Sequence, residues 1–220
     1  MAEAKSSNTP RARVVLVHGL WMNAAALLVL QMRLRHCGFD AVRFGYPTVR
    51  AGLEESAARL SELLKSQQAD EIHLAAHSMG GLVTLRSLEL YPDMRVRRIV
   101  LMGAPVAGSL SGRRLASFNA GKLLLGANLD LWGERHSVPV PDEVDIGVIA
   151  GTLPVGLGWI VGPLPKPHDG AVSVTETKLE GAADTIHLRV SHSAMLFSAE
   201  VGRQTCYFFK HARFAHPATD

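Results

Sequence analysis

Ser78 lies in a pattern that could make its hydroxyl a nucleophile. The sequence reads Ala76-His77-Ser78-Met79-Gly80, between an apolar run and a stretch with leucines at helical spacing. A strand, a sharp turn with a central serine and a following helix project the serine hydroxyl from the end of a sheet. Small residues two positions away on either side avoid a collision, and Ala76 adds only one methyl group to the usual glycine. The alternative is a serine that caps a helix in an ordinary strand–helix loop.

A serine nucleophile needs a base, and the chain offers ten histidines. His192 stands out because it follows an expected strand at 185–190, and open α/β sheets place their sites in loops at the carboxyl ends of strands. His73 lies within an expected strand, where a packed role is more usual. His77 adjoins the serine but is expected to point to the other side of the turn. These positions favour His192 as the base.

The base needs an acid that orients its imidazole and stabilises its positive charge. Asp169 follows the fifth expected strand and precedes His192, which gives the chain order Ser, Asp, His typical of this architecture. Its rivals include Asp145 and Asp184, which stand at the starts of strands and therefore at the opposite edge of the sheet. The sequence predicts Asp169 as the acid.

Two main-chain N–H groups could stabilise a tetrahedral oxyanion, those of Leu20 and Met79. Leu20 follows His18-Gly19 at the end of the first expected strand, and Met79 follows Ser78. The loop after an early strand and the residue after the nucleophile supply such donors, each worth about 10²–10³ in rate. A strand that ends in glycine is commonplace, however, and a merely packed His18 is the alternative.

The elements that must position these residues alternate between apolar strands and amphipathic helices. Strands are expected at 13–19, 39–46, 72–77, 96–102, 144–150 and 185–190, and helices at 24–35, 53–65, 79–90 and 194–210. This alternation predicts an α/β fold whose mostly parallel central sheet has about six strands and helices on both faces.

Two connections are longer than this pattern requires. Residues 106–140 are rich in Gly, Ser and Leu, and residues 151–167 are apolar but interrupted by Gly and Pro. Long loops often form lids or binding loops, and short helices that cover the core are the alternative. We expect a flexible tail at 1–12 and a single domain at 13–220 with a candidate lid or cap at 106–140.

The composition is that of a soluble globular protein and not of a disordered one. The 220 residues are 47% hydrophobic and 20% charged, with a net charge of +3. The basic cluster Arg95, Arg97 and Arg98 is interpreted as solvated strand-edge positions, so we expect no nucleic-acid partner. No apolar run reaches about 18 residues, so no stable membrane insertion is expected. No metal-binding cluster or phosphate-binding glycine motif is found, so neither a metal nor another cofactor is expected.

The N-terminal region lacks the apolar core of a signal peptide, so a cytoplasmic location is expected. Free thiols are then the default for the two cysteines, Cys37 and Cys206, although a pair between them stays open.

Together these motifs resemble the α/β-hydrolase superfamily and, within it, small bacterial lipases and esterases. The resemblance extends over about 13–209 and is carried by the segments 17–19, 76–81, 169–170 and 191–192. It implies Ser78 as nucleophile, His192 as base and Asp169 as acid. It also implies Leu20 and Met79 as oxyanion donors.

The expected activity is hydrolysis of carboxylic esters through an acyl-enzyme, with a small-molecule or lipid ester as substrate. The aromatic content of 6% and the Leu-, Val- and Gly-rich loops suggest an aliphatic acyl pocket for short or medium chains. Acyl transfer, or cleavage of a thioester or amide, would use the same three residues. A non-catalytic binding protein on the same scaffold is a less favoured alternative.

Overall fold

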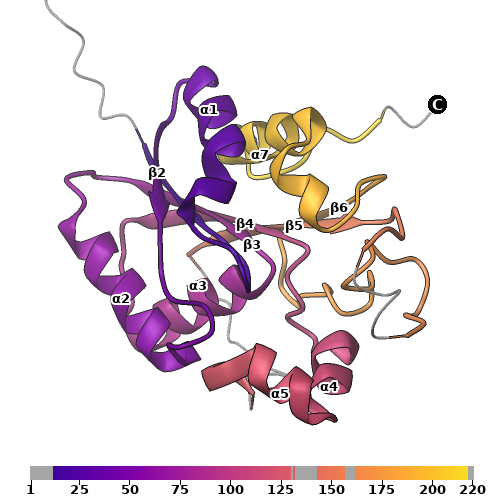
Figure 1. Ribbon diagram of the computed structural model, residues 1–220. Helices are drawn as coiled ribbons and strands as arrows, with labels where there is room; N and C mark the ends of the chain where they lie inside the picture. Colours follow the sequence, from indigo (N-terminus) through magenta and orange to yellow (C-terminus); the bar gives the residue numbers. More distant parts are fainter. Residues whose placement is uncertain (1–11, 130, 132–142, 157–161, 218–220) are drawn as a thin grey trace, which may run out of the picture.

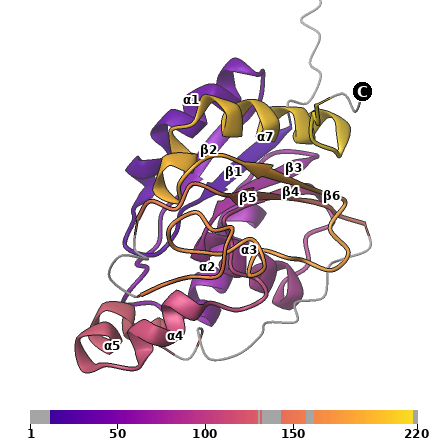
Figure 2. The same ribbon diagram turned by 90° about the vertical axis from the view of Figure 1, so that its right-hand side faces the viewer.

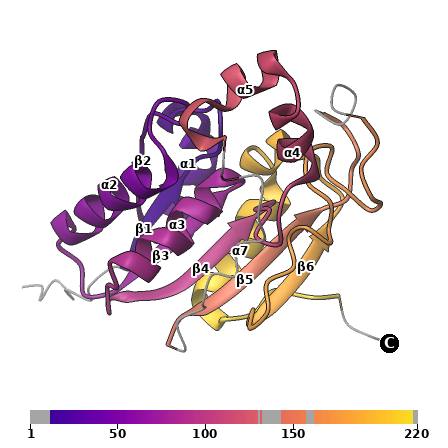
Figure 3. The same ribbon diagram turned by 90° about the horizontal axis from the view of Figure 1, so that it is seen from below.

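One parallel sheet organises the molecule. The structure, a computed structural model, describes residues 12–129, 131, 143–156 and 162–217. Six strands follow the order β2-β1-β3-β4-β5-β6, and every neighbouring pair is parallel (Figure 3). They are β1 (Arg13–Val17), β2 (Asp40–Phe44), β3 (Ile72–His77), β4 (Val96–Met102), β5 (Asp145–Gly151) and β6 (Asp184–Leu188). The predicted mostly parallel sheet of about six strands is confirmed.

Helices cover both faces of this sheet (Figure 1). One face carries α1 (Leu28–His36) and α7 (Ala199–His211), and the other carries α2 (Leu53–Ser66) and α3 (Met79–Leu90). Each face has its own apolar core, formed by alternate residues of the strands and the helices packed on them. The central strand β3 is buried along its whole length, as expected for a parallel strand covered on both sides. The candidate nucleophile Ser78 therefore directly follows a strand that is packed on both sides.

Two predicted helices are divided in the structure. The helix expected at 24–35 begins as the 3₁₀ turn η1 (Ala24–Leu27), whose N-cap Asn23 accepts a hydrogen bond from the Ala25 N–H. The helix expected at 194–210 consists of the 3₁₀ turn η4 (Ser193–Leu196) followed by α7. Ser198 separates them because its hydroxyl accepts from the Val201 N–H and caps a new helix. His192 thus stands at the start of a short, separate turn.

The long connection at 106–140 contains α4 (Leu110–Ala116), α5 (Asn119–Leu125) and the 3₁₀ turn η2 (Gly126–Asn128). Figure 2 shows α4 and α5 together at one corner of the molecule, away from α1 and α7. Residues 130 and 132–140 of this connection lie outside the described residues, as do 157–161 of the second long loop and all but the last residue of the predicted tail 1–12.

The expectation of free thiols is wrong. Cys37 and Cys206 form a disulfide, with their Cα atoms 6.3 Å apart. The bond joins the C-cap of α1 to α7, two helices that pack side by side on one face of the sheet although the cysteines are 169 positions apart.

Among the described helices, none is both long enough and apolar enough to cross a membrane.

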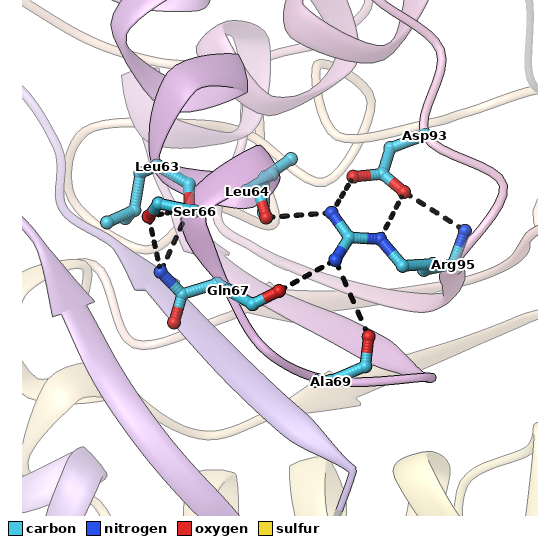
Figure 4. A network of polar contacts seen from close by, with 7 residues as sticks. All are labelled: Leu63, Leu64, Ser66, Gln67, Ala69, Asp93 and Arg95. Carbon is cyan, nitrogen blue, oxygen red and sulfur yellow. Dashed lines mark hydrogen bonds and ion pairs between the residues drawn. The ribbon is translucent and has the colours of Figure 1, made fainter.

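The basic cluster at the start of β4 supports the fold. Arg95 forms an ion pair with Asp93 at 2.6 Å and donates to the carbonyls of Leu64 and Gln67 at the end of α2, both at 2.8 Å (Figure 4). The hydrogen bonds from Arg95 hold the pKa of the Asp93 carboxyl below its usual range, against the effect of partial burial. Arg98 donates to a carbonyl at the end of α7. Arg97 is exposed, as expected for a solvated strand-edge position, whereas Arg95 and Arg98 are only partly exposed and bind neighbouring elements.

Candidate active site

Ser78 occupies a strained turn between β3 and α3. Its φ of 55° and ψ of −128° are rare for a residue other than glycine. Its N–H donates to the carbonyl of Met102 at the end of β4, which anchors the turn to the sheet. A Cβ on Gly80 would lie 2.6 Å from the carbonyl oxygen of His18, and a Cβ on Gly19 would lie 2.8 Å from Ser78 Cβ. The serine turn and the loop after β1 therefore meet only because both glycines lack a side chain.

Ser78, His192 and Asp169 form one hydrogen-bonded row. His192 Nε2 lies 2.9 Å from Ser78 Oγ, although the two residues are 114 positions apart. His192 Nδ1 lies 2.7 Å from Asp169 Oδ2. His192 follows β6 and Asp169 follows β5, so the carboxyl ends of parallel strands bring them to one edge of the sheet. The structure therefore brings together the three residues that the sequence analysis selected.

The charge of His192 and several hydrogen bonds hold the pKa of the Asp169 carboxyl down despite its burial. Burial by itself raises the pKa of this carboxyl, whose residue is only 1% exposed. The charge and hydrogen bond of His192, together with the N–H groups of Val172 and Ala171, outweigh burial and hold the pKa below its usual range. An ionised carboxylate accepts the Nδ1–H of His192, which leaves Nε2 free to accept the proton of the Ser78 hydroxyl.

Gly103 makes room for this contact, and the sequence analysis did not assign it a role. It follows β4 with a φ of 57°. A Cβ at this position would lie 3.0 Å from Asp169 Oδ2 and 3.1 Å from His192 Nδ1. A side chain here would press on the acid–base pair. The only signal in the sequence is a glycine directly after a buried strand.

A cavity of about 330 Å³ opens onto Ser78 and His192. Apolar side chains from several loops and from α4 and α5 line it: Leu20, Trp21, Met22, Pro105, Leu115, Leu125, Val155 and Val172. Among the described lining residues there is no Lys, Arg, Asp or Glu. The cavity is thus suited to an uncharged, apolar group next to the serine hydroxyl.

Of the two predicted oxyanion donors, Leu20 is among the lining residues of this cavity, whereas Met79, which directly follows Ser78, is not among its described lining residues. Met79 is buried and begins α3, where the first N–H groups of a helix have no acceptor within the helix. The imidazole of His18, in contrast, is buried against Tyr46 with ring centroids 4.6 Å apart, so its side chain has the packed role of the alternative interpretation.

The helices of the long connection form one wall of the cavity. Leu115 of α4 and Leu125 of α5 both line it. The indole N–H of Trp21, in the loop after β1, donates to the carbonyl of Leu124 at 2.8 Å. These helices therefore both cover the core and line the pocket, two roles that the sequence analysis treated as alternatives.

Glu176 is a buried carboxylate that no sequence motif marks. It accepts from the N–H and hydroxyl of Ser173 at 2.7 and 2.8 Å, and from the N–H of Leu110 at the start of α4. It thereby fixes the loop that carries Asp169 to the wall of the cavity. The rival acids Asp145 and Asp184 begin β5 and β6, at the opposite edge, as predicted.

Comparisons with known proteins agree with this architecture. The chain is 34% identical over 102 residues to the 2-hydroxy-6-oxo-2,4-heptadienoate hydrolase of Pseudomonas putida. The aligned region covers 41% of this chain and 37% of the relative. The chain thus aligns with little more than a third of that protein's length.

Solved structures with the same fold include a bacterial lipase and a metagenomic esterase. The mature lipase of Bacillus licheniformis has a TM-score of 0.73 at 16% identity, with 96% of each chain covered. A metagenomic carboxyl esterase has a TM-score of 0.62 at 20% identity, with 85% of this chain and 66% of that chain covered. At these identities the likeness establishes the fold. The model of the alpha/beta hydrolase family matches residues 14–198, and this match over most of the sequence shows that the chain belongs to the alpha/beta hydrolase family.

Proposed function

We propose that this protein is a serine hydrolase that cleaves carboxylic esters through an acyl-enzyme. The observation that carries the proposal is the row Ser78–His192–Asp169, with contacts of 2.9 and 2.7 Å, at the edge of an apolar cavity. A nucleophile within hydrogen-bond reach of a base that is itself oriented by a third group is the arrangement that activates a serine.

In the proposed mechanism His192 Nε2 accepts the Ser78 proton while Oγ attacks the ester carbonyl carbon. The N–H groups of Leu20 and Met79 stabilise the negative oxygen of the tetrahedral intermediate. His192 then gives its proton to the departing alcohol, which leaves an acyl group on Ser78. Water, deprotonated by His192, attacks this acyl group, and His192 then returns the proton to Ser78 Oγ as the bond between Oγ and the acyl carbon breaks and the acid leaves. Asp169 stabilises the imidazolium in both halves of the reaction.

The cavity favours an uncharged substrate. The relative from Pseudomonas putida is named for a dienoate, a substrate with a carboxylate. Burying a carboxylate without a compensating charge costs several kcal/mol. The described lining offers the hydroxyls of Ser109, Ser111 and Ser193 as hydrogen-bond partners, but no lysine or arginine. We therefore favour neutral esters with aliphatic acyl groups over acidic substrates, and a small molecule over nucleic acid as the partner.

We also propose that residues 13–220 form a single domain in which 106–140 acts as a cap on the cavity. The support is that Leu115 and Leu125 line the cavity and that Trp21 is bonded to Leu124. No cofactor takes part in the proposed mechanism.

A fluorophosphonate probe tests the proposal because it reacts with activated serines. We expect one adduct, located on Ser78 by mass spectrometry, and turnover of nitrophenyl acetate, butyrate or octanoate. The Ser78→Ala variant should lose both while keeping its melting temperature, whereas Ser66→Ala, which changes an exposed hydroxyl at the end of α2, should lose neither. Added alcohols would reveal acyl transfer as ester product. A folded wild-type protein that neither reacts with the probe nor turns over esters would refute the proposal.

A further inference from the structure

His77, the last residue of β3, touches the candidate base. Its ring is expected on the other side of the turn from the serine hydroxyl, but in the structure it lies against the ring of His192, and His77 is among the residues that line the cavity. His77 Nε2 is 2.9 Å from the carbonyl oxygen of His192, and the two ring centroids are 4.7 Å apart. His77 is fully buried.

This contact fixes the tautomer of His77. A carbonyl oxygen can only accept, so Nε2 must carry the hydrogen and donate it. Nδ1 is then an acceptor, and it has no hydrogen-bond partner in the part of the chain that the structure describes. It faces the loop after β1, where a Cβ on Gly19 would lie 3.2 Å away. The ring is therefore held in one orientation between this loop and His192.

The surroundings also keep His77 uncharged. Burial is the main cause that lowers its pKa to about 3, and the neighbouring His192 and His18 lower it further. The hydrogen bond to the His192 carbonyl and the charge of Asp169 act in the opposite direction but do not overcome burial. When His192 becomes an imidazolium, the ring beside it thus stays neutral and does not oppose that charge.

The main chain of His192 is held from both sides. Its N–H donates to the carbonyl of Asp169 at 2.9 Å, and its carbonyl accepts from His77. The two bonds hold the peptide groups on either side of the His192 Cα, so removing either one would let a flanking peptide group rotate and change the direction of the imidazole. A displacement of about 1 Å in a reacting group can cost on the order of 10²-fold in rate.

We propose that His77 is a positioning residue: its Nε2–H holds the carbonyl of His192 and so keeps the imidazole aligned between Asp169 and Ser78. This inference rests on the proposed function of that row.

Two substitutions separate the hydrogen bond from general packing. In His77→Gln the amide nitrogen takes the place of Nε2. In His77→Asn the amide nitrogen takes the place of Nδ1, and the shorter side chain cannot reach the His192 carbonyl. His73→Gln is the matched control, because His73 is also buried, lies four positions earlier in β3 and stacks on Phe209 instead of His192. The readouts are the rate of fluorophosphonate labelling, kcat and KM for nitrophenyl butyrate, the pH profile of kcat/KM and the melting temperature.

We expect His77→Asn to lower kcat and the labelling rate about 10- to 100-fold with KM changed by less than about threefold. The acidic limb of its pH profile should move to lower pH, because an imidazolium misaligned with Asp169 is less stabilised. His77→Gln should keep at least about a third of kcat, and His73→Gln should keep kcat even where its melting temperature falls.

A His77→Asn variant with kcat and labelling within about twofold of wild type would overturn the inference. The inference would also be overturned if His73→Gln lost as much kcat as His77→Asn while the melting temperatures of the two variants fell equally. If His77→Asn does not fold, ¹⁵N NMR of histidines in the wild-type protein decides: we expect His77 to stay in the Nε2–H form from about pH 5 to 9, and titration in that range would overturn the inference. A wild-type protein that the probe does not label would instead refute the proposed function.

Discussion

Replacing Asp169 with asparagine should force His192 into the wrong tautomer. Asp169 Oδ1 accepts from the N–H groups of Ala171 and Val172 at 2.9 and 2.7 Å, while Oδ2 lies beside His192 Nδ1. Because those two N–H groups can only donate, the amide oxygen of the variant must stay on them. Its amide nitrogen then faces Nδ1 and can only donate. Nδ1 must accept, so the imidazole proton moves to Nε2 and faces Ser78 Oγ.

An imidazole with its proton on Nε2 cannot accept the proton of the serine hydroxyl. The variant also lacks the negative charge that stabilises the imidazolium. In the protease triad the same substitution lowers kcat about 10⁴-fold, or about 5.4 kcal/mol at 1.36 kcal/mol per factor of ten. The two backbone contacts of Asp169 in this protein impose the same orientation on the amide, so we expect a loss of about 10³ to 10⁴ in kcat.

The assay is steady-state turnover of a nitrophenyl ester at neutral pH, with the melting temperature measured alongside. Asp184→Asn is the matched control, because Asp184 also contacts a histidine, His216 at 2.9 Å, but begins β6 at the opposite edge of the sheet. It should keep kcat within about twofold. A folded Asp169→Asn variant that retains more than about a tenth of wild-type kcat would refute this reasoning and move the acid elsewhere.

Three further predictions concern stability. The disulfide between Cys37 and Cys206 closes a loop of 169 positions, so its reduction should cost about 2–5 kcal/mol and lower the melting temperature by about 5–20 °C. Because the bond lies beside the start of β2, away from the site, kcat at low temperature should not change. An unaltered melting temperature after verified reduction would contradict the predicted loss of stability. Burial lowers the pKa of His73 to about 4, so the unfolded state binds a proton that the folded state does not, and stability should be full above about pH 6.5 and fall from there toward pH 4. Urea unfolding at several pH values tests this, and His73→Gln should remove the part of the dependence that comes from His73 and leave the part that comes from the buried His77. Trp21→Phe removes the hydrogen bond to Leu124 and should weaken the hold on α5 by about 1 kcal/mol, seen as about fivefold faster hydrogen exchange in that helix alone.

The alternation of strands and helices and the chemistry of the candidate site could be predicted from the order of the amino acids. Short apolar runs bounded by turn residues are typical of buried strands, and this pattern predicts strands at Val14 to Val17 and at Ile72 to His77. Parallel strands place their following loops at one edge, so the order of Ser78, Asp169 and His192 was enough to predict that they would meet.

Which distant segments share a face of the sheet is known only from the folded molecule. Local periodicity shows that a helix buries one side but not which helix lies next to it, so the bond between Cys37 and Cys206 could not be derived. The same holds for Glu176, which fixes the loop of Asp169 to the cavity wall, and for His77, whose donor meets a carbonyl 115 positions away. Such contacts depend on the relative placement of whole elements, which side-chain packing across the sheet determines and sequence spacing does not encode.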